Sequence, residues 1–180
     1  MGEEGKDFDD GDMTKIAEAI ASETNSQKKI TNCAILLPKG ADSLSEFSCA
    51  FYSALYSDNR YRTGDKKKVL AEDLSTVNII TDDAGASATE AIESGKKLAM
   101  GIYLTKDIVN APHNVLNSLG LANVARDIAE KSGGTIECKI LDKDECEKRG
   151  MGSFLGVARG SETEPQFIHL TYKPKSGDIK

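Results

Sequence analysis

The chain could do chemistry through its two histidines, its glycine-rich loop, its carboxylates or its cysteines. His113 follows Pro112, and His169 lies far downstream within an apolar run. Neither belongs to a His-Glu-x-x-His pattern, which places two zinc ligands on one helix face. We therefore predict that His113 lies in a loop and that His169 is a structural residue of a strand.

The segment from Gly150 to Gly156 resembles the glycine-rich loops that bind phosphate. Its spacing, G-x-G-x-x-x-G, is one residue off the dinucleotide fingerprint, and it lacks the lysine and following serine or threonine of a P-loop. No helix N-terminus is predicted after it, so we interpret it as a tight backbone turn. Ser153 and Ser161 have glycine neighbours, but neither lies in the G-x-S-x-G pattern of a hydrolase nucleophile.

The acidic residues and the cysteines also have simple structural interpretations. Asp142, Asp144 and Glu145 lie at the predicted start of a short helix, where the helix dipole favours negative charge. The cysteines are widely spaced, with no Cys-x-x-Cys pair: Cys33, Cys49, Cys138 and Cys146. A zinc site needs closer clustering, so we predict reduced thiols of a cytosolic compartment. The residues by themselves therefore indicate no catalytic, cofactor-binding or metal-binding site.

Charge and hydropathy exclude two classes of partner. The net charge is -6, and residues 1–12 carry most of it, with six acidic residues against Lys6. The remainder is nearly neutral, so there is no basic surface of the kind that binds nucleic acid. No apolar run approaches the roughly 20 residues that span a bilayer. We expect neither nucleic acid nor membrane as a partner, and we expect residues 1–12 to be a solvated tail.

The first half of the chain alternates between helices and strands. The predicted elements are a weakly anchored helix at 13–22, a strand at 30–37, a helix from Ser43 to about Ser57 and a strand at 77–80. Ile16, Ala17, Ala19 and Ile20 form the stripe of the first helix. The third element begins with a capping box, Ser43 to Glu46. Strand, helix and strand in this order predict a sheet with crossover packing.

One long helix is predicted over residues 86–109. Ala91, Gly95, Leu98 and Ile102 line one of its faces, with Ile92 and Ala99 beside them. Pro112 cannot continue the helix.

A second unit follows this long helix. Asn117 or Ser118 caps a helix that ends at Gly133-Gly134, with Leu121, Val124, Ala125 and Ile128 on one face. An alternating strand over Ile136–Ile140 comes next. A short helix from Asp142 to Gly150 and a strand at 166–172 complete the unit. These are too few strands for a closed sheet, and we expect an exposed sheet edge.

Four stretches, in order and at family-like spacing, resemble the leucyl aminopeptidase (cytosol aminopeptidase) family, especially its plant-type members. They are Gly95–Gly101 (GKKLAMG), Thr105–Asn114 (TKDIVNAPHN), Gly150–Ala158 (GMGSFLGVA) and Pro165–Tyr172 (PQFIHLTY). The second is similar to the family signature T-R-D-L-V-N-x-P-x-N, with Lys106 in place of the arginine. Pro112, Gly150 and Gly152 match motif positions that we interpret as shaping the backbone.

The resemblance implies an α/β architecture in several parts. Residues 1–28 would be an acidic tail and weak helix, and residues 29–85 the remnant of an N-terminal α/β domain of macro-like type. Residues 86–109 would be the linker helix. Residues 110–180 would be the truncated opening of the C-terminal α/β aminopeptidase domain. Family members assemble as hexamers, so the resemblance also implies a homo-oligomer.

The resemblance further implies metal-dependent removal of N-terminal amino acids from peptides by two divalent ions, zinc, manganese or magnesium. No residue of this chain matches a family metal ligand, catalytic lysine or catalytic arginine, so we carry over no site residue. We expect no bound metal and no activity from these 180 residues alone. The expected location is the cytoplasm, or the plastid for a longer form.

Two other functions stay open at this point. One is a non-catalytic assembly or regulatory partner of full-length aminopeptidase subunits. The other is a ligand-binding module, because the family's N-terminal domain resembles nucleotide-binding macro domains. No glycine loop of that kind is evident before residue 86.

Overall fold

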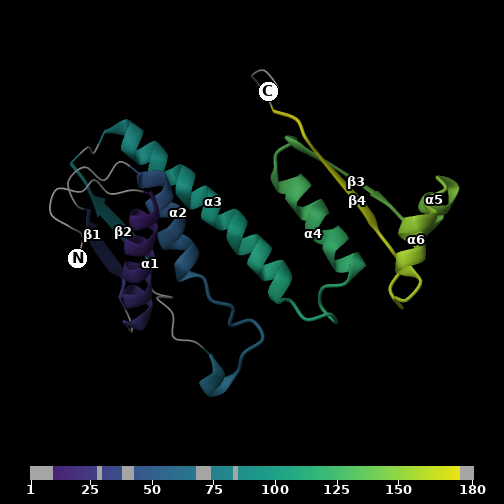
Figure 1. The fold of residues 1–180 in the computed structure, drawn as a ribbon, viewed down its shortest axis with the longest axis horizontal. Coiled ribbons are helices and arrows are strands. Elements are labelled where there is room, and N and C mark those ends of the chain that lie inside the picture. The colour runs from purple at the N-terminus through teal and green to yellow at the C-terminus, as the bar shows by residue number, and fades with distance from the viewer. Residues whose placement is uncertain (1–9, 28–29, 38–42, 68–73, 83–84, 175–180) are drawn as a thin grey trace. The chain divides into compact units, whose positions relative to one another are not determined.

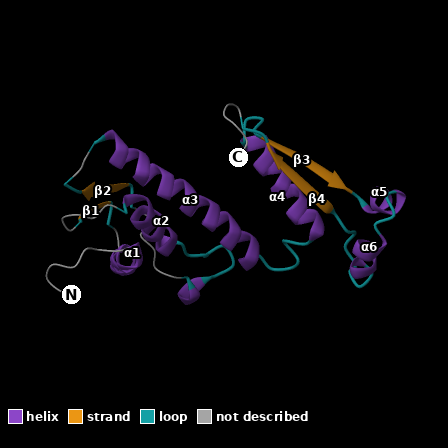
Figure 2. Ribbon diagram, turned by 45° about the horizontal axis from the view of Figure 1, so that its top comes forward, coloured by secondary structure: helices purple, strands orange, loops and turns teal. Residues whose placement is uncertain are grey.

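A computed structural model describes residues 10–27, 30–37, 43–67, 74–82 and 85–174. The chain divides into two compact units, Met1–Val109 and Asn110–Lys180. Each unit combines helices with a two-stranded sheet (Figure 1, Figure 2), which confirms the predicted α/β class. The acidic residues before Asp10 lie outside the described residues. No helix within the described ranges is long and apolar enough to span a membrane.

The first helix, α1, runs from Asp10 to Ser26 and is longer at both ends than the helix predicted at 13–22. Residues 10–12 of the predicted tail are therefore helical, and so are residues 23–26 after the predicted helix. The buried Thr24 explains the C-terminal extension, because its hydroxyl donates a hydrogen bond of 2.8 Å to the Ile20 carbonyl within the helix. A threonine bonded in this way is satisfied inside a helix.

The prediction that α1 is weakly anchored is wrong. Met13, Ala17 and Ala21 are fully buried in the core of the first unit, and α1 packs along the second helix. Ile16 and Ile20, on which the predicted stripe was centred, are only partly buried beside them. The alanines carry little apolar signal in a sequence, but their small side chains allow two helices to pack closely.

The second helix, α2, spans Leu44–Leu55, with Ser43 as its N-cap residue. The predicted capping box does not form, because the Ser43 side chain makes no capping hydrogen bond. Its ψ of 55° departs from the extended conformation that aims a capping side chain at the first amides. The Ser43 backbone carbonyl instead accepts a 2.9 Å hydrogen bond from the Phe47 amide.

Strands β1 (Asn32–Leu36) and β2 (Thr76–Ile80) flank α2 in sequence and pair in parallel. The register runs from Asn32 opposite Thr76 to Leu36 opposite Ile80. This arrangement confirms the predicted strand–helix–strand unit with a crossover connection. Among the described residues, β2 pairs only with β1.

Two phenylalanines of α2 form the centre of the core in the first unit. Phe47 and Phe51 are fully buried, and their rings stack with centroids 6.2 Å apart. Aliphatic and small residues from α1, the start of α2, the third helix and the segment Ile35–Leu37 surround them: Met13, Ala17, Ala21, Ile35, Leu37, Leu44 and Ala88. The core is therefore mainly aliphatic.

The long third helix, α3, spans Ala86–Asn110, in agreement with the helix predicted at 86–109. Gly95 and Ala99 of the predicted face are buried, as is Ala88, but the prediction is wrong for Leu98, which is 61% exposed. Since α3 crosses α2 closely at Gly95, only small residues fit between the two helices. The larger Leu98 lies at the flank of that contact.

Helix α4 (Ser118–Lys131) opens the second unit. The Asn117 side chain caps it by accepting a 3.1 Å hydrogen bond from the Gly120 amide. Gly133 and Gly134, with φ of 61° and 90°, follow its end, as predicted. The predicted apolar face is again shifted, because Ala122 and Ala125 are buried whereas Leu121 is 39% exposed.

Strands β3 (Ile136–Leu141) and β4 (Phe167–Tyr172) form an antiparallel pair in the second unit (Figure 2). The predicted alternation of Ile136, Cys138 and Ile140 is confirmed, since all three are partly buried while Glu137 and Lys139 between them are exposed. Helix α5 (Lys143–Lys148) follows β3. Among the described residues the sheet has two open edges, and Tyr172 on β4 is 69% exposed.

Candidate functional site

The glycine-containing stretch at Gly95–Gly101 lies in the middle of α3, and α2 packs closely against α3 at Gly95. A Cβ atom on Gly95 would lie 2.1 Å from the Ser45 carbonyl oxygen and 2.9 Å from the Cys49 amide nitrogen. The buried Ser48 donates a 2.7 Å hydrogen bond to the Ile92 carbonyl beside this contact. The stretch therefore has a packing role.

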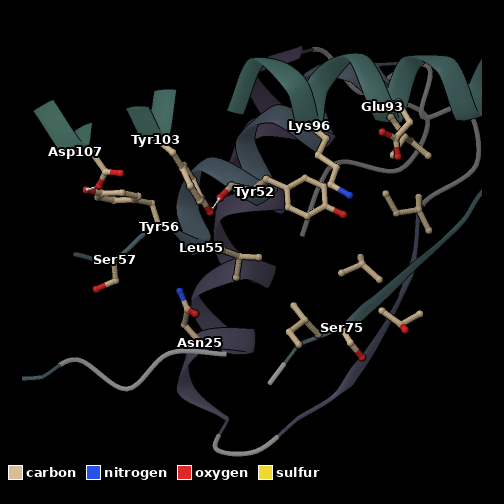
Figure 3. A pocket seen from close by; sticks show the side chains of 15 residues that line it. Asn25, Tyr52, Leu55, Tyr56, Ser57, Ser75, Glu93, Lys96, Tyr103 and Asp107 are labelled. Atoms are coloured by element: carbon tan, nitrogen blue, oxygen red, sulfur yellow. Dashed lines mark hydrogen bonds between the residues drawn. The ribbon is translucent and has the colours of Figure 1, made fainter. Parts of the chain in front are cut away.

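The signature stretch Thr105–Asn114 covers the C-terminal end of α3 and the four residues after it. Its Asp107 binds two side chains of the first unit. The Tyr56 hydroxyl donates a 2.8 Å hydrogen bond to the Asp107 carboxylate (Figure 3). The Arg60 guanidinium lies 3.0 Å from the same carboxylate and also donates to the Asp107 carbonyl. Asp107 therefore links the segment after α2, which contains Tyr56 and Arg60, to α3.

Side chains from neighbouring helices satisfy the C-terminal end of α2. The last four carbonyls of a helix have no partner within it. Three of these carbonyls accept side-chain hydrogen bonds: Tyr52 from the Tyr103 hydroxyl, Ser53 from the Lys106 ammonium at 3.1 Å, and Ala54 from the Asn25 amide at 3.5 Å. Lys106 also lies 5.1 Å from the centre of the Tyr56 ring. Lysine at this signature position therefore caps a helix, and arginine could donate in the same way.

No sequence pattern predicted the roles of Tyr56, Arg60 and Tyr103, which connect α3 to the end of α2 and to the segment after it. Burial raises the pKa of Tyr103 to about 12, so its hydroxyl stays a hydrogen-bond donor. Tyr52 and Tyr56 are one helical turn apart, and this aromatic pair was the only signal that the sequence offered. Their partners on α3 lie about fifty residues later and follow only from the fold.

The Asp58–Arg60 pair gives a pH-dependent prediction. The two donor nitrogens of Arg60 lie 2.9 and 2.8 Å from the two Asp58 carboxylate oxygens, and these hydrogen bonds lower the pKa of Asp58 to about 2. An unfolded aspartate titrates near about 4. The stability from this pair is therefore fully present above about pH 4 and is lost as the pH falls towards 2.

An NMR titration of the Asp58 carboxyl carbon measures this directly. We expect a midpoint near the lowered pKa of about 2, and a return towards about 4 in Arg60→Gln. Arg62→Gln is the control, because Arg62 contributes least to the lowering of the Asp58 pKa. An ordinary Asp58 midpoint in the unaltered chain would contradict the pairing.

Both histidines lie where the sequence predicted. His113 is exposed in the turn after Pro112, whose carbonyl accepts hydrogen bonds from Val115 and Leu116 at 2.8 and 2.9 Å. His169 is an exposed residue of β4 opposite Lys139. Neither is part of a metal-ligand group, since no three His, Cys, Asp or Glu side chains of the described ranges come together to hold an ion.

The glycine-rich segment contains a helix that the sequence did not predict. Gly150 has a φ of 67° and makes the predicted turn, but helix α6 begins directly after it and spans Gly152–Ala158. The expectation of a turn with no following helix is therefore wrong, because a short apolar run between glycines carries a weak helical signal. Phe154 packs edge-on against Phe167, with ring centroids 5.6 Å apart, so tertiary contact stabilises α6.

The remaining polar candidates have structural roles. The Asp142 side chain accepts a 2.9 Å hydrogen bond from the Glu145 amide and caps α5, which confirms the interpretation of these carboxylates as a capped helix start. Ser153 is exposed on α6. Ser161 lies in the following loop and accepts a 3.1 Å hydrogen bond from the Thr163 amide. No base lies beside either hydroxyl among the hydrogen bonds of the described residues.

A cavity in the first unit lies beside Tyr52, Tyr56 and Tyr103 (Figure 3). It has a volume of about 810 Å³ and is lined by α2, α3, β2 and the end of α1. Tyr52, Tyr56 and Tyr103 contribute to its wall, with Glu93 and Lys96 on α3. None of these five residues was predicted to bind a ligand.

Comparison with known proteins finds one matching family model and several similar relatives. The catalytic-domain model of the cytosol aminopeptidase family matches residues 103–180, beginning within α3. A probable cytosol aminopeptidase of Rippkaea orientalis is 38% identical over 165 residues, which is 90% of this chain and 32% of the relative. A probable cytosol aminopeptidase of Trichodesmium erythraeum is 41% identical over 122 residues, 68% of this chain and 23% of the relative. The chain thus spans about a third or less of the length of these relatives.

Solved structures have the same fold. A mutant of tomato leucine aminopeptidase superposes with a TM-score of 0.84 and 26% identity, over 98% of this chain and 36% of that protein. A bottromycin maturation enzyme in complex with manganese superposes with a TM-score of 0.73 and 20% identity, over 91% of this chain and 34% of that protein. The second likeness concerns the fold alone.

Proposed function

Since the chain belongs to the cytosol aminopeptidase family, also called the leucyl aminopeptidases, we propose that it serves the metal-dependent removal of N-terminal amino acids from peptides. The match of the family's catalytic-domain model from Tyr103 onward carries this proposal. The signature stretch that ends α3 supports it, because its Lys106 and Asp107 both have defined contacts in the fold.

We assign the parts of the chain by the family's architecture. Residues 1–28 are a tail with its helix, and 29–85 are part of the N-terminal domain. Residues 86–109 are the linker helix, and 110–180 begin the catalytic domain. The uninterrupted α3 and the division into compact units at Val109 and Asn110 support these assignments.

The metal pair of the family, two ions of zinc, manganese or magnesium, supplies an activated water when bound. The donor set of the described residues does not fit such a pair, because it contains no group of three metal-ligating side chains. We therefore assign no catalytic, cofactor-binding or metal-binding residue, and we propose that these 180 residues are inactive alone. Peptide substrates, a homohexamer, and a cytoplasmic location, or a plastid location for a longer form, belong to the same proposal.

Hydrolysis of leucyl p-nitroanilide by the purified 180-residue chain tests the proposal. With added manganese or zinc, we expect no turnover above the buffer blank, while the Rippkaea orientalis relative serves as the positive control. Metal-dependent turnover that co-elutes with the chain in gel filtration would contradict the assignment. Loss of that turnover in His113→Ala or His169→Ala would then identify the unrecognised site.

A second candidate function is a non-catalytic partner of full-length subunits. The exposed apolar residues of α3 favour it, since Leu98 and Val109 are 61% and 76% exposed. If this function is correct, the chain should co-elute with the Rippkaea orientalis aminopeptidase and change its rate. The double variant Leu98→Ser and Val109→Ser should abolish both effects.

A further inference from the structure

The cavity of the first unit has an aliphatic part formed by three elements. Leu55 of α2, Val77 and Ile79 of β2, and Ile92 of α3 line it, and all four are partly buried. Its volume of about 810 Å³ lies within the range of roughly 300–1,000 Å³ that is typical of small-molecule sites. The cavity can therefore shield a branched aliphatic group from water.

A polar group of three side chains lies at one wall of the same cavity. The Tyr52 hydroxyl points into the hollow, and Lys96 lies beside it (Figure 3). The Lys96 ammonium is 5.4 Å from the centre of the Tyr52 ring. Burial and the nearby Glu93 carboxylate raise the pKa of Tyr52, which keeps its hydroxyl protonated. The wall thus offers a cation, an anion and a neutral hydroxyl.

The cation and the anion of this wall are available to a ligand. Glu93 and Lys96 are exposed and one helical turn apart, yet none of the ion pairs found among the described residues involves either of them. Residues three positions apart in a helix project from the same face, so both side chains border the cavity. Lys96 lies against Tyr52 instead of pairing with Glu93, so the two charges stay separate.

We propose that this cavity binds an apolar α-amino acid as a zwitterion. Glu93 receives the ammonium group, Lys96 and the Tyr52 hydroxyl receive the carboxylate, and the aliphatic side chain enters the space between Leu55, Val77, Ile79 and Ile92. The ammonium and the carboxylate of the ligand are bonded to the same α-carbon. Each of these charged groups meets a side chain of opposite charge on one face of α3. The inference rests on the cavity and not on peptidase activity, so either can fail without the other.

An NMR titration of the ¹⁵N-labelled 180-residue chain with L-leucine tests the site. We expect saturable shifts of the Glu93, Lys96 and Ile79 amides, with the amide of Leu141 in the second unit unchanged. The two analogues 4-methylpentanoate and 3-methylbutylamine each lack one charged group, and glycine lacks the aliphatic group. Each one-charge analogue should bind more weakly than leucine by about two- to fivefold, since exposed charge pairs contribute modestly. Glycine should also bind more weakly, because it buries no apolar side chain.

Charge-neutralising variants provide the matched controls. Glu93→Gln and Lys96→Gln should each weaken leucine binding by about two- to fivefold. Glu90→Gln and Lys97→Gln alter the same residue types on α3 outside the cavity lining, and they should leave binding unchanged. Absence of saturable shifts at the cavity, equal binding of either one-charge analogue, or equal loss in the control variants would overturn the proposal.

Discussion

Gly95→Ala is expected to destabilise the first unit by about 3 kcal/mol, which is large for the addition of one methyl group. The new Cβ would lie 2.1 Å from the Ser45 carbonyl oxygen. Because that atom belongs to the backbone of α2, the clash is relieved only if one helix moves. The movement would also stretch the 2.7 Å hydrogen bond from Ser48 to the Ile92 carbonyl. Urea denaturation followed by circular dichroism measures the loss.

Gly101→Ala is the matched control for this prediction, because it lies on the same helix and a Cβ atom added there would meet nothing within 4 Å. Alanine has the higher helix propensity, so Gly101→Ala should stabilise the protein by about 0.5–1 kcal/mol. Opposite signs at the two glycines are the decisive result. Equal effects would show that the α2–α3 contact at Gly95 is not formed in solution.

Phe51→Ala is expected to cost about 3–5 kcal/mol, because it leaves a cavity in a packed core. Phe51 is fully buried, stacks on Phe47 and contacts the edge of Tyr52 at a centroid distance of 5.4 Å. Typical domains have only about 5–15 kcal/mol of stability in total, so the variant should unfold at much lower urea concentrations. Hydrogen exchange should show the loss in the amides of α1 and α2, which both line this core.

Tyr61→Ala is the control for Phe51→Ala, since Tyr61 is 47% exposed and its ring contacts the Arg60 guanidinium at 5.3 Å. Surface substitutions of this kind change stability by about 0.5 kcal/mol, and an exposed cation–π contact adds about 0.5–1 kcal/mol. A cost for Phe51→Ala as small as that for Tyr61→Ala would mean that the phenylalanine core is loosely packed.

Local sequence patterns predicted most of the regular structure. The alternation of Ile136, Cys138 and Ile140 indicated β3 correctly, and the aspartate before α5 predicted its cap. The order of strand, helix and strand also predicted the parallel pair β1–β2. These features depend on residues that are close in sequence, or on rules that follow from the order of elements. For this reason they can be derived before the fold is known.

Errors arose where small residues or short segments decide the packing. Ala17 and Ala21 anchor α1 although the isoleucines carry the stronger apolar signal. Leu98 is exposed because Gly95 sets the approach of α2 and α3. An apolar stripe gives the approximate direction of the core. The side of the stripe that is buried depends on the shape of the neighbouring element.

The amino-acid sequence by itself determined the family, the order of elements and the positions of the signature residues. Only the tertiary structure decided what these residues do: Asp107 binds Tyr56 and Arg60, Lys106 caps α2, and Glu93 and Lys96 share a cavity wall with Tyr52. The partners lie about forty to fifty positions apart in the chain. Hydrogen bonds and ion pairs require atoms within a few ångströms of each other, and the chain brings such distant residues together only through the packing of complete helices.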